Sequence, residues 1–105
     1  MPRLTTPPDM PGEVAAAIEV IGNRVRARVL RELALHGPQT AVDLAAAIGQ
    51  RREVVYQQLV VLEDAGLVSA DEPPGRRLGR TVHWTVRDDA VQNLVARIGA
   101  YLAGK

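Results

Sequence analysis

The chain has 105 residues with 13 basic and 12 acidic side chains, a net charge of +1 and no cysteine. This length predicts one domain, and the lack of cysteine excludes disulfides and thiolate metal sites and suits a reducing compartment. No apolar run approaches the roughly 20 residues that cross a bilayer, so we expect a cytoplasmic protein without a membrane partner. Because the net charge is small, the distribution of arginines matters more than their number. Two short clusters stand out, formed by Arg51, Arg52, Arg76, Arg77 and Arg80.

Residues 1–12 contain four prolines and predict a disordered N-terminal arm, which precedes one folded domain over residues 13–105. Apolar residues at helical spacing predict a first helix over residues 13–21. A second helix over residues 24–36 begins after Asn23, a residue that favours the helix N-cap, and carries arginines on its outer sides. A glycine follows each of these segments and favours the end of the helix there.

The next two helices are joined by a short turn that contains a glycine. Thr40 and Asp43 have the spacing of a capping box, with Asp in place of the commoner Glu or Gln, and they predict the start of a third helix that Gly49 ends. The fourth helix covers residues 51–65 and ends at Gly66, which is well placed for a left-handed C-cap.

After the fourth helix the apolar pattern changes to period two. Residues 67–72 and 80–86 are predicted strands, and the Pro- and Gly-rich segment 73–79 is the turn between them. A last helix with a regular apolar stripe follows over residues 89–102. A short strand near Gln39 that pairs with the hairpin has only weak support. We therefore predict a mainly α fold with a small β-hairpin, in the order of four helices, two strands and one helix.

The third and fourth helices have the features of a helix-turn-helix. This motif requires a small residue where the helices cross, a glycine in the turn and an apolar residue that fixes the second helix, and Ala45, Gly49 and Val55 meet these requirements. A charged hairpin directly after the second helix predicts the winged form of the motif. Its arginines are predicted to contact sugar-phosphate, and in the alternative they are ordinary solvated turn residues. The predicted backbone contacts are Thr40, Arg76, Arg77 and Arg80.

The fourth helix has two distinct faces. Val55, Leu59 and Leu62 form an apolar stripe that should meet the core, so the residues opposite point outward. A helix in the major groove uses its N-terminal residues for base edges, where arginine suits guanine, glutamine suits adenine and glutamate accepts from cytosine. The predicted base-reading residues are Arg51, Arg52, Glu53, Tyr56 and Gln57. The role of Glu53 stays open: it can read a cytosine, limit non-specific phosphate binding or pair with a surface arginine.

Four segments, "IGNRVRARVLREL", "DLAAAIG", "LVVLEDAGLV" and "GRTVHWTV", follow one another over about residues 14–102. Together they resemble the ArsR-type winged-helix repressors. Three typical motifs of that family are matched here, and they begin at Gly22, Leu62 and Gly79. The resemblance implies a homodimeric DNA-binding repressor that dimerises through its first and last helices. Arg24 stands where the family often has proline, and "QRREVVYQQ" replaces the usual recognition helix. The operator sequence therefore does not carry over from the family.

The first and last helices carry apolar stripes that a small winged-helix core does not fully use. We expect them to form a two-fold interface with a second copy, although in the alternative both helices simply cover the core. A dimer would place its recognition helices roughly 34 Å apart and match a palindromic site. The predicted interface residues are Val14, Ile18, Ile21, Val91, Leu94, Val95, Ile98, Tyr101 and Leu102.

The sequence predicts no metal site, no cofactor and no enzyme. Metal-sensing members of the family carry cysteines, or acids and histidines along the last helix, whereas His36 and His83 stand alone here. No phosphate loop and no nucleophile beside a histidine is present in the sequence. The primary hypothesis is a dimeric repressor that binds double-stranded DNA, with any small-molecule effector undefined. The alternative is a winged-helix module for protein contacts without an operator of its own.

Overall fold

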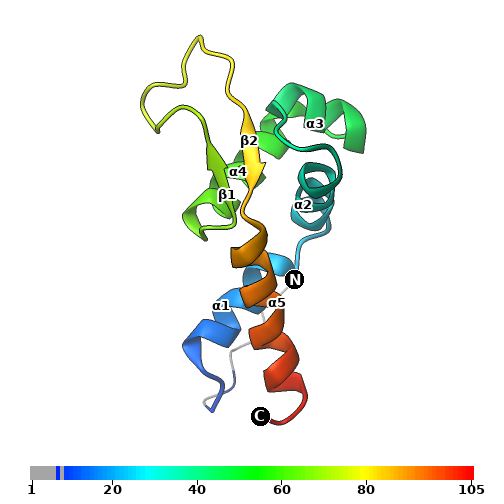
Figure 1. The fold of residues 1–105 in the computed structure, drawn as a ribbon, viewed down its shortest axis with the longest axis vertical. Helices are drawn as coiled ribbons and strands as arrows, with labels where there is room; N and C mark the ends of the chain where they lie inside the picture. Colours follow the sequence, from blue (N-terminus) through cyan, green and yellow to red (C-terminus); the bar gives the residue numbers. More distant parts are fainter. Residues whose placement is uncertain (1–6, 8) are drawn as a thin grey trace.

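The computed structural model describes residue 7 and residues 9–105, and in this part of the chain it contains five helices and one two-stranded hairpin (Figure 1). The predicted mainly α fold and its order of elements are confirmed. Residues 1–6 and 8 of the predicted arm lie outside the described residues. The elements are α1 (Gly12–Ile21), α2 (Arg24–His36), α3 (Ala41–Ile48), α4 (Arg52–Asp64), β1 (Val68–Ala70), β2 (Trp84–Val86) and α5 (Asp88–Leu102).

The molecule is elongated, with a long axis of 45 Å, and has two parts along it. Helices α1 and α5 pack side by side at one end, while α2, α3, α4 and the hairpin form the other (Figure 1). No helix among the described residues is long and apolar enough to span a membrane. The helix pair predicted to dimerise therefore lies at one end of the molecule, and the predicted helix-turn-helix lies at the other.

Local sequence determines where the helices begin. The Asn23 side chain accepts a hydrogen bond of 3.0 Å from the backbone N–H of Arg26 at the start of α2. The Thr40 hydroxyl accepts one of 3.1 Å from the N–H of Asp43 at the start of α3. Each cap satisfies a backbone donor that has no partner within its helix. Gly49 has a φ of 69° in the turn before α4, a left-handed conformation that glycine adopts readily.

The core lies between α2, α3, α4 and the hairpin. Val55, Leu59 and Leu62 of α4 are fully buried, as their stripe predicted. Trp84 of β2 is the largest fully buried side chain and belongs to the same cluster. Because this stripe fixes the rotation of α4 about its axis, the opposite face of the helix is turned to solvent.

Strands β1 and β2 are shorter than the predicted strands at 67–72 and 80–86. They pair antiparallel, and Ala70 lies opposite Trp84 at the last regular pair. Residues 71–83 beyond this pair form the wing. Proline and glycine are abundant there, and both weaken a strand, because proline lacks a backbone donor and glycine has no side chain to pack.

A single bridge ties the start of α3 to the hairpin. The backbone N–H of Gln39 donates to the carbonyl of Trp84 at 3.1 Å, and the N–H of Trp84 donates to the carbonyl of Gln39 at 2.8 Å. The Gln39 side-chain amide also donates to the carbonyl of Glu32 at 3.0 Å. The weakly supported strand near Gln39 is thus an isolated bridge, which holds the helix-turn-helix against the base of the wing.

Arg26 connects three helices. Its Nη1 donates to the carbonyls of Glu19 and Val20 at the end of α1, at 3.1 and 2.9 Å. Its Nε donates to Oε1 of Gln58 on α4 at 2.7 Å. Since charge-assisted hydrogen bonds are stronger than neutral ones, this one side chain fixes α1 and α4 relative to α2.

Candidate nucleic-acid interface

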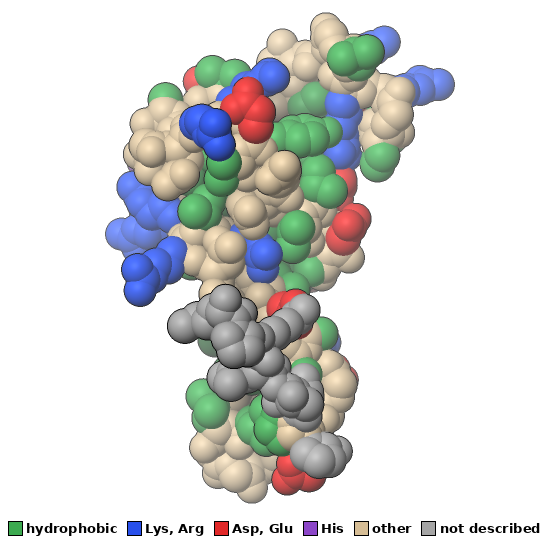
Figure 2. All heavy atoms as spheres, turned by 180° about the vertical axis from the view of Figure 1, so that it is seen from behind, with side chains coloured by type: hydrophobic (Ala, Val, Ile, Leu, Met, Phe, Trp, Pro, Cys, Tyr) green, Lys and Arg blue, Asp and Glu red, His purple; other side chains and the backbone are tan. Residues whose placement is uncertain are grey.

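A groove of about 1080 Å³ lies between the wing and the helix-turn-helix. Its walls are the start of α3, the outer face of α4 and the wing, which projects at the upper right in Figure 2. Arg51 and Arg76 are exposed but do not line the groove. The structure brings the other predicted DNA residues together along it: Thr40, Arg52, Glu53, Tyr56, Gln57, Arg77 and Arg80.

The start of α4 presents exposed charged side chains. Arg51 occupies the N-cap position and makes no side-chain capping bond, and Arg52 and Glu53 follow in the first turn. Gln57 is exposed one turn further on. Among the described residues, the side chains of Arg51 and Arg52 have no hydrogen bond and no ion pair. Their guanidinium donors are therefore available to another molecule.

Arg77 is turned into the protein, contrary to the solvent-facing position that the sequence predicted. Its Nη1 and Nη2 donate to the two carboxylate oxygens of Glu63 at 3.1 and 2.6 Å, and its Nε donates to the carbonyl of Glu72 at 2.9 Å. The guanidinium carbon also lies 4.8 Å from the ring centroid of Trp84. Only 10% of the Arg77 side chain is exposed. Three of its five N–H donors are thus used within the chain, and the phosphate contact predicted for Arg77 stays a prediction.

Tyr56 links α4 to the wing. Its ring meets Trp84 edge to face, with centroids 6.1 Å apart and planes at 82°, a favoured arrangement for aromatic pairs. The residue is 39% exposed, so part of it covers Trp84 and part faces the groove. We call Tyr56, Glu63, Arg77 and Trp84 the wing anchor. The hydrogen bonds from Arg77 to Glu63 raise the pKa of Arg77 above its ordinary value, although burial acts the other way.

The tip of the wing is exposed. Arg76 has no ion pair among the described residues, and Arg80 lies 3.5 Å from Glu72 with 60% of its side chain exposed. Leu78 between them is fully exposed, and no sequence pattern singled it out. Gly79 has a φ of 72°, which lets the chain turn back toward β2. The tip thus presents two cations and one apolar side chain.

An acid and a histidine face each other at the base of the wing. The backbone N–H of His83 donates to Oδ1 of Asp71 at 2.9 Å, and Nδ1 of the ring lies 3.3 Å from Oδ2. The backbone bond is the main cause that lowers the pKa of Asp71 below its ordinary value, and the histidine ring adds to it. The backbone N–H of Asp71 still donates to the carbonyl of His83 at 3.1 Å, so the Asp71 side chain replaces only the second backbone bond of this pair.

Sequence reasoning also missed Glu32, a buried carboxylate on α2. It is 6% exposed and pairs with Arg28 one turn earlier and with Nε2 of His36 one turn later, at 3.4 Å. The i, i+4 spacing of these residues is the signal that could have revealed the cluster. No group of three or more His, Cys, Asp or Glu in the described part of the chain could hold a metal ion.

The predicted dimer residues differ in their exposure. Val14 and Leu94 are buried where α1 packs against α5, so they support this end of the molecule from within and only a small part of each is exposed. Ile18, Val95 and Leu102 are exposed by 38%, 51% and 75%. The remaining predicted residues are half-buried: Ile21, Val91, Ile98 and Tyr101.

Known proteins share this architecture. Residues 21–69 match a family described as a helix-turn-helix domain. A crystal structure of a "possible transcriptional regulator for arsenical resistance" is 28% identical, with a TM-score of 0.68 over 82% of this chain and 83% of that one. An ArsR-like transcriptional regulator from Rhodococcus sp. RHA1 is 23% identical, with a TM-score of 0.66 over 87% of this chain and 83% of that one. This chain contains a helix-turn-helix domain and has the winged helix-turn-helix fold that these regulators share.

The ArsR-type fold also appears in a homodimeric winged helix-turn-helix DNA-binding domain from Mycobacterium bovis. That domain is 22% identical, with a TM-score of 0.64 over 84% of this chain and 78% of that one. No curated protein matches the sequence. The resemblance to ArsR-type winged-helix proteins that the sequence motifs suggested is thus confirmed, and the proteins that resemble this chain are described as transcriptional regulators.

Proposed function

We propose that this ArsR-type protein is a sequence-specific transcriptional regulator that binds a palindromic DNA operator as a homodimer and represses by blocking promoter access. One observation carries the proposal. Arg52 and Glu53 in the exposed first turn of α4 line the same groove as the exposed Arg80 of the wing, and the buried stripe of α4 fixes the helix in that orientation. A helix held in this way can enter the major groove while a wing follows the backbone.

The first turn of α4 is proposed to read bases. Arg51 and Arg52 have the bidentate donors that match O6 and N7 of guanine, and Gln57 suits N6 and N7 of adenine. Glu53 accepts from N4 of cytosine in this proposal. Tyr56 contributes the exposed part of its ring, and its packing against the wing limits how far it can move.

Backbone contacts are proposed for the start of α3 and for the tip of the wing. Thr40 lines the groove at the N-terminus of α3, and Arg76 and Arg80 are exposed at the tip. Arg77 has a different role from the one expected, because it anchors the wing to α4 through Glu63. The anchored wing holds its two exposed arginines at a fixed place relative to the recognition helix.

The dimer is proposed to form through the α1–α5 end of the chain. Ile18, Val95 and Leu102 offer exposed apolar surface there, and the similar domain from Mycobacterium bovis is homodimeric. A two-fold dimer would place two α4 helices on successive major grooves, roughly 34 Å apart. We place the protein in the cytoplasm, where the DNA of a bacterial-type regulator is accessible.

Selection of genomic DNA fragments by the purified protein tests this function. The proposal expects enrichment of an inverted repeat whose half-sites lie about 10 base pairs apart or at a multiple of that spacing. Sedimentation at micromolar concentration should show a dimer. A monomer that enriches no sequence would instead favour a protein-contact module, for which Val42 and Leu78 offer exposed apolar side chains, with Val42 56% exposed.

A further inference from the structure

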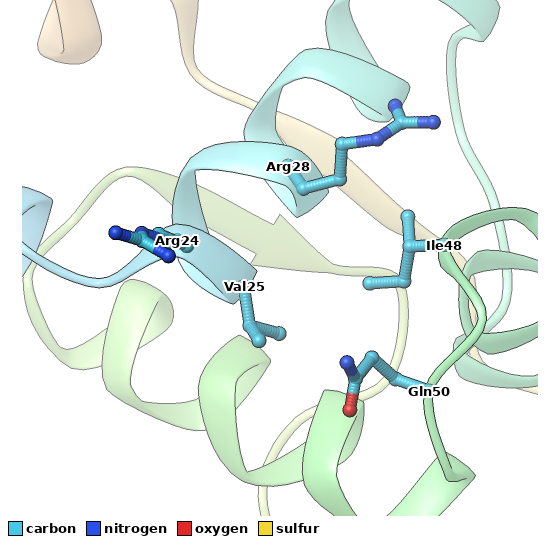
Figure 3. Close-up of a pocket in the computed structure, with 5 residues that line it drawn as sticks. All are labelled: Arg24, Val25, Arg28, Ile48 and Gln50. Carbon is cyan, nitrogen blue, oxygen red and sulfur yellow. The ribbon is translucent and has the colours of Figure 1, made fainter.

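A second basic surface lies outside the groove, on the far side of the start of α4. A hollow of about 260 Å³ separates the N-terminal half of α2 from the turn between α3 and α4. Figure 3 shows Val25 and Arg28 on α2 opposite Ile48 and Gln50, while the guanidinium of Arg24 at the start of α2 points away from these two residues. The residues that line the hollow therefore combine a small apolar floor with two cations and an amide, and include no carboxylate.

The arginines of this surface continue along α2. Arg24, Arg28 and Arg31 are exposed or half-buried and spaced by four and three residues, which places them on one stripe of the helix. In Figure 2 blue side chains gather at the left edge, where α2 lies in that view. Arg28 pairs with the buried Glu32, which orients it, while Arg24 and Arg31 have no ion pair among the described residues.

The position of this stripe is set by the chain itself. Gln50, on the rim of the hollow, directly precedes Arg51 and Arg52 at the start of α4. The wing lies on one side of this point and the α2 stripe on the other. A recognition helix in a major groove about 12 Å wide has a phosphate backbone on each side of it. The wing faces one of these phosphate backbones, so the other backbone lies on the side of α2.

We infer that the α2 stripe, which comprises Arg24, Arg28 and Arg31, binds the DNA backbone on the side of the recognition helix opposite the wing. The seven helical steps from Arg24 to Arg31 span about 10.5 Å. Phosphates of one strand follow one another at a rise of about 3.4 Å along the DNA axis, so the stripe is long enough to meet more than one of them. Arginine forks bind phosphate oxygens in pairs, and the hollow beside Gln50 gives the strand room to approach. This inference rests on the proposed function.

The test measures binding to a 30-base-pair duplex of random sequence between 50 and 200 mM salt, because phosphate binding does not depend on sequence. The variant Arg24→Gln/Arg31→Gln leaves the Arg28–Glu32 pair intact. Removal of each arginine–phosphate pair should lower the slope of log affinity against log salt by about 0.9. The charge-conserving variant Arg24→Lys/Arg31→Lys should keep the slope of the parent. Arg97→Gln, which removes an exposed arginine on α5, is the matched control and should leave the slope unchanged.

The outcomes separate this inference from the proposed function. If the parent binds no duplex at 50 mM salt, the proposed function fails and the inference fails with it. If the parent binds and Arg24→Gln/Arg31→Gln shows the parent's slope, the α2 stripe does not touch DNA and only the inference is overturned. An equal loss of slope in Arg97→Gln overturns it as well, because the effect would then come from net charge rather than from this surface.

Discussion

The wing and the start of α4 both carry arginines, and they use them in opposite ways. In the wing, Arg77 is held by the carboxylate of Glu63, a backbone carbonyl and the ring of Trp84. At the start of α4, Arg51 and Arg52 are exposed and make no hydrogen bond or ion pair within the described residues. Arg77 therefore holds the wing in position, whereas Arg51 and Arg52 are presented to solvent by α4. Sequence alone shows only that both regions are basic.

The largest expected effect is on stability, at the wing anchor. Arg77→Met should lower the free energy of unfolding by about 3 kcal/mol, because it leaves the largely buried Glu63 carboxylate without its partner. Arg76→Met, at the adjacent exposed position, should change it by less than about 0.5 kcal/mol. Chemical denaturation of both variants measures the difference. If the two variants are equally stable, Arg77 is an ordinary surface arginine and the wing anchor does not exist in solution.

The next effect should appear in DNA recognition without any change in stability. Arg51→Ala should cost about 1–3 kcal/mol of binding at one base position and relax the preference there. Its free energy of unfolding should stay within about 0.5 kcal/mol of the parent, since Arg51 makes no capping bond. Titration of the selected fragment and of fragments with single base changes measures the cost in binding, and chemical denaturation measures the free energy of unfolding. An unchanged base preference in Arg51→Ala would remove this residue from the reading surface.

A smaller effect is expected for the exposed arginines at the tip of the wing. Arg80→Gln and Arg76→Gln should each lower the salt slope by about 0.9 if each arginine neutralises one phosphate, which is roughly a threefold change in relative affinity between 50 and 200 mM salt. The decrease should be the same for specific and random duplexes, because phosphates carry no sequence information. A decrease confined to the specific fragment would mean that the wing reads bases instead.

The smallest effect concerns pH at the base of the wing. The pKa of Asp71 is lowered in the folded protein, chiefly by the backbone N–H of His83. A carboxyl whose folded pKa is below its unfolded value of about 3.9 stabilises the fold above that value, and the contribution disappears as pH falls through the folded pKa. Asp71→Asn should therefore be slightly less stable than the parent at pH 7, and the difference should disappear as pH falls through the folded pKa. Denaturation of both proteins from acid to neutral pH checks this sign.

Much of the fold follows from local sequence signals. Asn23 and Thr40 cap the helices that they were expected to cap, and Gly49 makes the left-handed turn of the helix-turn-helix. The period of Val55 and its partners fixed the buried side of α4 and hence the side that faces the groove. These signals act over a few residues, so a single sequence is enough to reveal them.

The parts that sequence did not predict depend on contacts between distant segments. Arg77 lies 14 residues from Glu63 along the chain, and no spacing rule connects a loop to the end of a helix. The strands end early where Asp71 engages His83, a contact between the two sides of the wing. The burial of Val14 and Leu94 within one chain likewise depends on how α1 meets α5. Each of these contacts exists only once the chain has folded.

The central claim is that the exposed start of α4 reads DNA, and a paired fragment selection tests it most directly. The parent and Arg51→Ala/Arg52→Ala are used side by side to select genomic fragments at the same salt concentration. We expect the parent to enrich an inverted repeat, while the variant, although equally stable, should retain only weak binding without sequence preference. Enrichment of the same repeat by both proteins, or of no sequence by the parent, would contradict it.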